Sequence, residues 1–206
     1  MNGILNIYKN KGMSSFDVVR KVKFVAKERK VGHTGTLDPE ATGVLPVCLG
    51  KATKIIDYIM NSNKVYEVKF LLGIKTTTYD LEGEVIEKKD ISNITHEDVL
   101  SAIEYFVGEY DQVPPMYSAL KKNGVRLYDL ARQGIEVERE ARRVNILDIN
   151  NIKIELPYVS MKVTCTKGTY IRSLCYDIVE KLNVGATMCE LNRCSTSVFY
   201  EENSVN

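Results

Sequence analysis

The sequence predicts an α+β protein in which helices flank a central, largely antiparallel mixed sheet. Three observations over the 206 residues favour this class. Several short segments alternate between apolar and polar residues, as half-buried strands do. Segments with a period near 3.6 lie between them and indicate helices. The two kinds do not follow the regular strand-helix-strand order of a parallel sheet. No linker interrupts the chain, so residues 1–206 fit one domain.

The first element is a helix that begins after Met13, where Ser14 or Ser15 can cap its first turn. Its apolar face comprises Val18, Val19, Val22, Val25 and Ala26. Residues 65–72 then alternate as a strand, with Tyr66, Val68, Phe70 and Leu72 on one face. A second strand, residues 84–88, is expected to pair with it across the loop 79–83.

A second helix begins with a capping box, Thr95-x-x-Asp98, and stops at Gly108. Its inward residues are Val99, Ile103, Phe106 and Val107. Strand patterns return at residues 145–156 and 159–165. The last helix follows Gly168-Thr169, with Arg172 lying off an apolar stripe that comprises Ile171, Leu174, Ile178 and Leu182.

Composition excludes several classes of protein. Hydrophobic residues make up 44% and charged residues 27%, as in globular domains. No apolar run is as long as a membrane span, and the first residues lack the order of a signal peptide, so we expect a cytoplasmic protein. The five cysteines form no CxxC pair and only two histidines are present, which argues against a disulfide framework or a zinc site. Neither GxGxxG nor GxxxxGK[ST] occurs.

Positive charge is concentrated in two segments, although the net charge is only +1. Residues 1–60 contain 10 Lys and Arg against 5 Asp and Glu, and residues 114–144 contain 7 against 4. Two such segments can follow a phosphate backbone, because each Lys or Arg that neutralises a phosphate releases condensed counterions. A merely solvated basic face is the alternative.

The segment VGHTGTLDPEATGVLPVCLG, residues 31–50, surrounds Asp38 with Gly, Thr, His and Pro. On residue types alone, Thr36, Asp38 and Pro39 are explained as a turn or a helix start. A chemical role for Asp38 therefore needs further support, which four other stretches of the chain provide.

Five stretches together resemble the TruB family of tRNA pseudouridine synthases along nearly the whole chain. They are GILNIYKNKGMSSFDVV, GHTGTLDPEATGVLPVCLGKATK, KVYEVKFLLGIKTTTYDLEGE, QVPPMYSALKKNGVRLYDLARQG, and CTKGTYIRSLCYDI followed by LNRCSTSVF. The resemblance implies the pseudouridine synthase fold, with a mobile RNA-binding insertion at about residues 112–140. It implies isomerisation of uridine 55 in the T loop of tRNA, without metal, redox cofactor or group donor.

The resemblance also assigns the catalytic residues. Asp38 matches the family's nucleophilic aspartate, which attacks C1′ of the ribose or C6 of the base, or promotes elimination to a glycal. Arg172 matches the arginine of GTYIR, which keeps that carboxylate ionised although burial would raise its pKa. Tyr66 matches the tyrosine that stacks on the target uracil. On residue types alone, a surface arginine and a core aromatic explain Arg172 and Tyr66.

Further positions are assigned to substrate and RNA. His33 matches the residue that enters the RNA loop and holds the target base out, and Tyr170 and Leu191 match the pocket wall. The expected phosphate contacts are Arg20, Lys23, Lys27, Lys121, Lys122, Arg126 and Arg132. The partner is then the T-arm stem-loop of tRNA, and we expect a monomer that needs neither a membrane nor another protein.

The chain departs from the family where it stops at Asn206, because relatives continue into a small RNA-binding module that we do not expect here. Three other functions remain open. The first is a non-catalytic RNA-binding protein or tRNA folding chaperone that keeps the shape of the pocket. A glycosidase-like hydrolase also uses an Asp beside a sugar, but no paired acid is evident. A guide-RNA-dependent relative would act on other RNAs.

Overall fold

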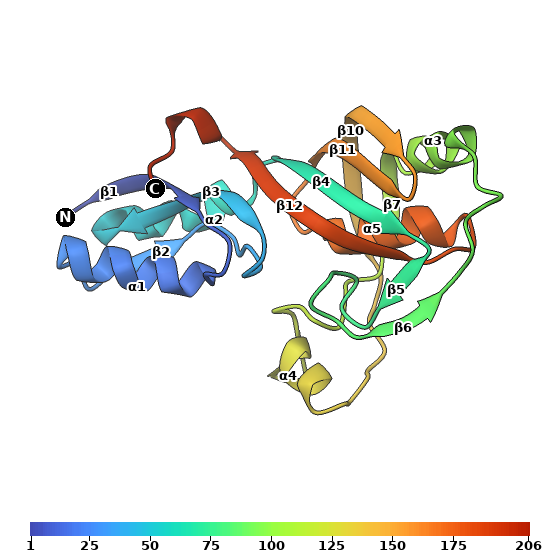
Figure 1. Cartoon of the computed structure of the whole chain (residues 1–206). Helices are drawn as coiled ribbons and strands as arrows, with labels where there is room; N and C mark the ends of the chain where they lie inside the picture. Colours follow the sequence, from blue (N-terminus) through green and yellow to red (C-terminus); the bar gives the residue numbers. More distant parts are fainter. The chain divides into compact units, whose positions relative to one another are not determined.

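The computed structural model describes residues 1–206, which form two compact units (Figure 1). Unit 1 comprises residues 1–68, 162–167 and 190–206, and unit 2 comprises residues 69–161 and 168–189. The prediction of a single domain with an insertion at residues 112–140 stays a prediction.

The main sheet has the strand order β1-β3-β12-β4-β11-β10-β7, with β2 beside β3 and β13 beside β12. Its strands are β1 (Gly3–Lys9), β2 (Val31–His33), β3 (Thr42–Leu49), β4 (Lys64–Leu72), β7 (Gly108–Gln112), β10 (Arg142–Glu155), β11 (Tyr158–Cys165), β12 (Ala186–Thr196) and β13 (Phe199–Tyr200). β3 pairs antiparallel with β1 and β2, as do β10 with β7 and β12 with β13, whereas β12 runs parallel to β3. The predicted α+β class with a mixed sheet flanked by helices is confirmed.

In unit 1, α1 (Ser15–Ala26) begins at the predicted cap. Ser14 accepts a hydrogen bond from the backbone of Asp17, whose side chain accepts one from the backbone of Ser14. The helix buries Val18, Val19 and Val22. A 3-10 helix (Gly50–Ile55) and the short helix α2 (Ile56–Met60) follow β3, and a second 3-10 helix (Glu201–Asn203) follows β13.

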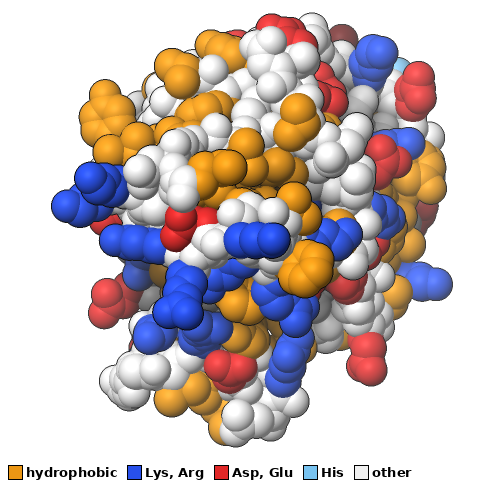
Figure 2. Space-filling view, turned by 90° about the vertical axis from the view of Figure 1, so that its left-hand side faces the viewer, with side chains coloured by type: hydrophobic (Ala, Val, Ile, Leu, Met, Phe, Trp, Pro, Cys, Tyr) orange, Lys and Arg blue, Asp and Glu red, His pale blue; other side chains and the backbone are white.

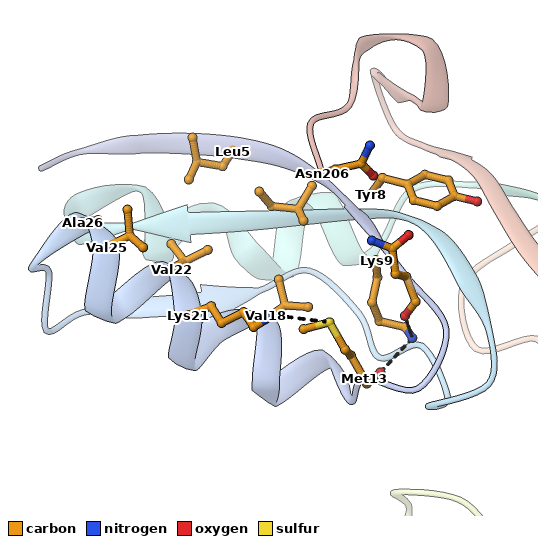
Figure 3. Close-up of a pocket in the computed structure, with 12 residues that line it drawn as sticks. Leu5, Tyr8, Lys9, Met13, Val18, Lys21, Val22, Val25, Ala26 and Asn206 are labelled. Carbon is orange, nitrogen blue, oxygen red and sulfur yellow. Dashed lines mark hydrogen bonds between the residues drawn. The ribbon is translucent and has the colours of Figure 1, made fainter.

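Val25 was expected on the buried face of α1 but is 80% exposed. It borders a pocket of about 290 Å³ between α1 and β1, together with Leu5 and Val22 (Figure 3). Asn206 also borders this pocket, because the C-terminal residues pair with β1 through Ile7 and Val205. The last turn of α1 therefore faces an open hollow, where no strand covers Val25.

In unit 2, α3 (His96–Tyr105) and α5 (Ile171–Glu180) pack together, and α3 also packs on β10. The Thr95–Asp98 capping box forms as predicted, and Val99 and Ile103 are buried. Val107, expected inward, is 48% exposed because the helix has already ended at Tyr105. Gly108, expected to stop the helix, lies beyond its end and begins β7 with φ +109.

The expected pairing of residues 84–88 with the strand at 65–72 is wrong. Gly73, with φ +83, ends β4 and starts a separate short strand, β5 (Ile74–Thr76). β6 (Val85–Lys88) pairs with β5 in a two-stranded sheet of its own. Periodicity indicated the strand correctly, but it could not show that the chain turns at a glycine before pairing.

Within residues 112–140, the hairpin β8 (Lys121–Lys122) and β9 (Val125–Arg126) precedes the short helix α4 (Leu127–Arg132). Gly124 lies in the turn of the hairpin and Gly134 lies just after the helix, both with positive φ. All five cysteines of the protein are free thiols, and Cys48, Cys165 and Cys175 are buried. None of the helices is long and apolar enough to cross a membrane.

Candidate active site

Asp38 lies in unit 1, in the loop that joins β2 to β3. The loop is tied down on both sides of this residue. The Ser15 hydroxyl donates to the carbonyl of Leu37 at 3.1 Å and accepts from its N–H at 2.9 Å. The N–H of Ala41 donates to the carbonyl of Asp38 at 3.1 Å. Asp38 is half-buried, and its backbone is held in a tight turn. The turn interpretation and a chemical role are therefore compatible.

Lys9 at the end of β1 is a buried cation beneath this loop. Its side chain is fully buried, and Nζ donates to the carbonyls of Met13 at 2.7 Å, Asn10 at 3.0 Å and Pro39 at 3.0 Å. Burial lowers the pKa of Lys9 to about 8, although the negative charge of Asp38 acts in the opposite direction. The sequence analysis did not single out Lys9. A lysine at a strand end gives no sign that three carbonyls will enclose it.

Tyr66 projects from β4 into the interior of unit 1 and is 8% exposed. Burial raises the pKa of its phenol, and the Arg193 guanidinium, within hydrogen-bonding reach of the hydroxyl, opposes that shift. The negative charge of Asp38 also raises the pKa of Tyr66, so the two side chains interact electrostatically. The core-aromatic interpretation and a role at the site coexist.

His33 and Leu191 also belong to unit 1. His33 ends β2 opposite Val47, is half-buried, and has its pKa lowered mainly by burial. Its Nδ1 is buried without a hydrogen-bond partner. Leu191 lies half-buried on β12, where its carbonyl accepts from the Thr42 hydroxyl at 3.5 Å. Unit 1 thus holds four predicted site residues: His33, Asp38, Tyr66 and Leu191.

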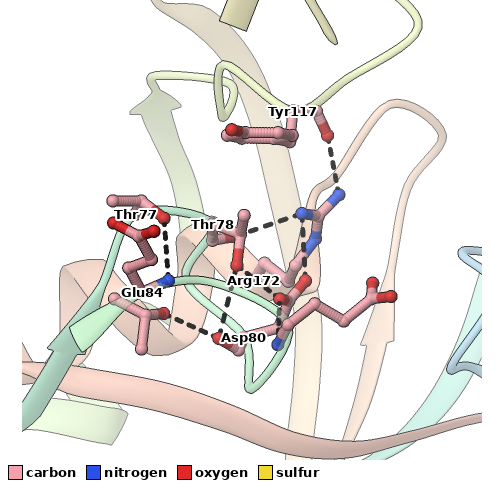
Figure 4. A network of polar contacts seen from close by, with 8 residues as sticks. Thr77, Thr78, Asp80, Glu84, Tyr117 and Arg172 are labelled. Atoms are coloured by element: carbon pink, nitrogen blue, oxygen red, sulfur yellow. Dashed lines mark hydrogen bonds and ion pairs between the residues drawn. The ribbon is translucent and has the colours of Figure 1, made fainter. Parts of the chain in front are cut away.

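Arg172 lies in the first turn of α5, in unit 2, and is 6% exposed. The sequence placed it off the apolar stripe, where a surface arginine is the ordinary expectation, but it is buried. Its guanidinium donates to the carbonyl of Thr78 at 3.1 Å, to Oδ2 of Asp80 at 3.2 Å and to the carbonyl of Tyr117 at 2.8 Å (Figure 4). The ion pair with Asp80 is therefore largely shielded from solvent, and it holds the guanidinium in one position.

Asp80 is a functional candidate that the sequence analysis missed. It is 8% exposed and accepts from the N–H of Glu82 at 3.1 Å, besides its contacts with Thr78 and Arg172. The neighbouring Tyr79 adopts a left-handed backbone with φ +64 and stacks on Tyr176 at 4.2 Å between ring centroids. A left-handed tyrosine is uncommon, and such residues gather at functional sites. In the sequence, Asp80 lies within the expected loop 79–83. Its contact with Arg172 of α5 is formed only in the folded chain, so the sequence does not reveal it.

Tyr170 immediately precedes α5 and is held through its backbone. Gln112 accepts from the Tyr170 N–H at 2.8 Å and donates to its carbonyl at 3.1 Å. The start of the helix that carries Arg172 is thereby fixed. Nearby, burial raises the pKa of Asp177 to about 7, and this carboxyl accepts from the Tyr110 hydroxyl at 3.3 Å.

Comparison with known proteins decides the family. Residues 22–171 match the model described as "TruB family pseudouridylate synthase (N terminal domain)". The whole chain is 67% identical to "tRNA pseudouridine synthase B" of Clostridium perfringens strain SM101 and spans 70% of that protein. It is 59% identical to the protein of the same name from Clostridium tetani, spanning 71% of it. The chain belongs to the TruB family.

The structural comparisons agree with the TruB assignment. A solved "Cbf5-Nop10-Gar1 Complex" superposes with a TM-score of 0.75 and 32% identity, covering 97% of this chain and 50% of that one. The predicted pseudouridine synthase fold and the predicted isomerase class are confirmed at the level of the family. The TruB assignment does not test the roles of single residues, so each predicted site residue remains a prediction. Asp38 and Arg172 belong to different units, and their pairing also stays a prediction.

Basic side chains of this TruB chain are exposed in both predicted segments. Arg20 and Lys23 on α1 and Lys27 at its C-cap are exposed, and Lys and Arg gather on the face that carries this helix (Figure 2). Arg20 also pairs with Asp17 within the helix. Within residues 112–140, Lys121, Lys122, Arg126 and Arg132 are exposed. The two arginines lie over the ring of Tyr128, at 5.7 and 5.5 Å from its centroid.

Proposed function

We propose that this chain isomerises uridine 55 in the T loop of tRNA to pseudouridine, with Asp38 as the nucleophile. The observation that carries the proposal is the 67% identity, along the entire chain, to a tRNA pseudouridine synthase B. The tied loop that presents Asp38 beside the buried Tyr66 provides a suitable place for the reaction.

The chemistry needs only groups that the protein already has. The bond from N1 of uracil to C1′ breaks, the base turns, and a bond from C5 to C1′ forms. C5 then loses its proton and N1 gains one, so no group enters or leaves overall. A carboxylate at Asp38 can attack C1′, attack C6 or promote elimination to a glycal. All three routes require that carboxylate to be ionised and close to the flipped nucleoside.

Arg172 is proposed to stabilise that carboxylate. A guanidinium close to a buried carboxylate lowers the pKa of the carboxylate by roughly 1–3 units. The ion pair with Asp80 and the two carbonyl contacts support this role, because they hold Arg172 charged and in one orientation. In this proposal Asp80 and Gln112 act indirectly: Asp80 fixes the guanidinium, and Gln112 fixes the backbone where α5 begins.

Access to the target requires the uridine to leave its stack, which costs a few kcal/mol. RNA loops reduce that cost, and proteins read them through shape and stacked bases. We assign stacking on the uracil to Tyr66, extrusion of the base to His33, and the pocket wall to Tyr170 and Leu191. The exposed basic residues of α1 and of the insertion are assigned to phosphates. The partner is tRNA, and we propose a cytoplasmic monomer that needs no other protein.

A guide-RNA-dependent activity is the second candidate, because solved relatives include an "H/ACA RNP bound to a substrate RNA containing 2'-deoxyuridine" at 28% identity. The identity to tRNA pseudouridine synthase B is more than twice as high, at 67%, and favours action on tRNA without a guide. The two candidates differ in one requirement. Only the second needs an added RNA to select the uridine.

The test is incubation of the chain with a T-arm stem-loop in the absence of guide RNA, followed by mapping of the modified uridine. We expect one uridine to change, at the position equivalent to 55, with no change in product mass. Free uracil and an abasic site would instead identify a hydrolase. Stable binding without any modification would identify an RNA-binding protein or chaperone, and a requirement for added guide RNA would identify the second candidate.

A further inference from the structure

Arg193, on β12, is buried more completely than any of the predicted site residues. Its exposure is 1%, and it is one of the largest fully buried side chains of the protein. A guanidinium carries five N–H donors and stays charged. Buried donors left without acceptors destabilise the folded state, so the partners of this group show which segments it holds together.

Two of its partners flank the Asp38 loop. Nε donates to the carbonyl of Val44 at 2.8 Å, and Nη2 donates to the carbonyl of Gly35 at 3.3 Å. Gly35 precedes Asp38 and Val44 follows it, so one planar group bridges the two ends of the loop. The peptide segment between those carbonyls contains the whole of TLDPEATG.

The backbone of Arg193 is pressed against the same loop end. Arg193 pairs with Gly43 in the parallel register between β12 and β3. A Cβ added to Gly43 would lie 2.3 Å from the carbonyl oxygen of Arg193 and 2.6 Å from its nitrogen. Gly43 also has φ +111, so no other residue fits there without strain. The backbone of Arg193 is therefore in close contact with the loop end at Gly43, in addition to the contacts of its side chain.

The guanidinium also acts on the phenol of Tyr66. Burial raises the pKa of this phenol, and Arg193 opposes that rise by its charge and by hydrogen bonding. The same side chain therefore holds both ends of the loop of the proposed nucleophile and acts on the phenol assigned to the target base.

We propose that Arg193 is a positioning residue for the isomerisation, which fixes the two ends of the Asp38 loop through one guanidinium and places its positive charge near the Tyr66 hydroxyl. This inference rests on the proposed function. A lysine cannot replace it, because an ammonium group is a compact point charge, whereas the guanidinium fork reaches several acceptors in fixed directions. A misplacement of about 1 Å in a reacting group can cost about 10²-fold in rate.

A purely structural role makes a different prediction. If Arg193 only stabilises the fold, activity falls in proportion to the unfolded fraction, and any equally destabilising change in unit 1 has the same effect. Val19→Ala is a matched control, because Val19 is 3% exposed on α1 and is not assigned to the site.

The experiment measures kcat and KM on a T-arm stem-loop for the wild type, Arg193→Lys, Arg193→Met and Val19→Ala, together with unfolding midpoints. We expect Arg193→Lys to remain folded and to lose about 10²-fold in kcat, with KM changed less than about threefold. Val19→Ala should retain the wild-type kcat at temperatures where it is folded. If Arg193→Met does not fold, the lysine variant still decides the question.

A kcat for Arg193→Lys within about threefold of the wild type would overturn the inference, and so would a loss that tracks only the unfolded fraction. The link to Tyr66 is tested by adding Tyr66→Phe, which keeps the ring and removes the hydroxyl. We expect the losses in the double variant to be less than multiplicative, and fully multiplicative losses would overturn this link. An inactive wild type would instead defeat the proposed function, so the two failures are distinguishable.

Discussion

The two units stabilise their buried cations in different ways. In unit 2, the buried guanidinium of Arg172 pairs with the carboxylate of Asp80 and donates to two carbonyls. In unit 1, Lys9 donates to three carbonyls and Arg193 donates to two. The carboxylate of Asp80 holds the charged group of Arg172 in place. The carbonyls bound by Lys9 and Arg193 belong to the backbone, so these two cations hold the Asp38 loop in place. The contacts of unit 2 therefore orient the guanidinium of Arg172, whereas those of unit 1 orient the Asp38 loop.

The largest expected effect comes from removing the charge partner in unit 2. Asp80→Ala removes the carboxylate that pairs with the buried guanidinium of Arg172, so the free energy of unfolding should fall by about 3–5 kcal/mol. Urea denaturation measures this change. Glu180→Gln is the control, because its pair with Lys75 at 3.4 Å is largely exposed and should contribute less than about 1 kcal/mol. Equal losses in the two variants would remove the distinction between the units.

A pH-dependent effect of similar size is expected from Asp177. Burial raises the pKa of Asp177 to about 7, so the folded state favours the protonated carboxyl over the ionised one. Because the folded pKa lies above the unfolded one, this contribution to stability is complete below the unfolded pKa, near 3.8. It is lost as the pH rises through about 7, and amounts to at most about 4 kcal/mol.

Asp177→Asn isolates this effect. Relative to the wild type, the variant should gain stability between pH 4 and pH 8, because the asparagine cannot ionise and still accepts from Tyr110. Unfolding free energies at about five pH values in this window provide the measurement. A constant difference between the two proteins across the window would contradict the raised pKa.

In unit 1 the corresponding weak point is a glycine. Gly43→Ala should destabilise the protein by about 1–3 kcal/mol through its positive φ, and further through the clash with the backbone of Arg193. Gly168→Ala is the control, since Gly168 has φ +81 but nothing within 4 Å of an added Cβ. Thermal unfolding of both variants separates strain from contact. A Gly43 variant no less stable than the Gly168 variant would show that the close approach of β12 is unimportant.

The smallest effects are expected on the surface. Lys23→Gln and Lys27→Gln should each weaken binding of a T-arm stem-loop by a few-fold and reduce the slope of log K against log salt by about 0.7–0.9. Lys153→Gln on β10 is the exposed control outside the two basic segments. A salt titration of binding measures both quantities. If all three variants share one slope, the basic face of α1 is merely solvated.

The sequence predicted the elements whose signals are local. The capping boxes at Ser14 and Thr95 and the alternation from Val65 to Leu72 appear where expected, because they depend on neighbouring residues. β3 and β12 were not predicted. β3 is almost continuously buried, so it shows no alternation, and β12 mixes polar and apolar residues because parts of it belong to both units.

The candidate site was predictable only through the family resemblance. Asp38 has the residue neighbours of an ordinary turn, and Arg172 those of a surface helix. Asp80, Lys9 and Arg193 could not be found from patterns, because each is buried by segments far away in the sequence. Arg193 meets Gly35 and Val44 across more than a hundred residues, and no local periodicity records such a contact.

The most direct test of the central claim compares the wild type with Asp38→Asn on a T-arm stem-loop whose uridines carry tritium at C5. Both proteins should bind the RNA with similar affinity, since asparagine preserves the shape of the loop. The wild type should release tritium stoichiometrically with one modified uridine, and the variant should release none. Equal release by the two proteins would contradict the assignment of Asp38 as the nucleophile.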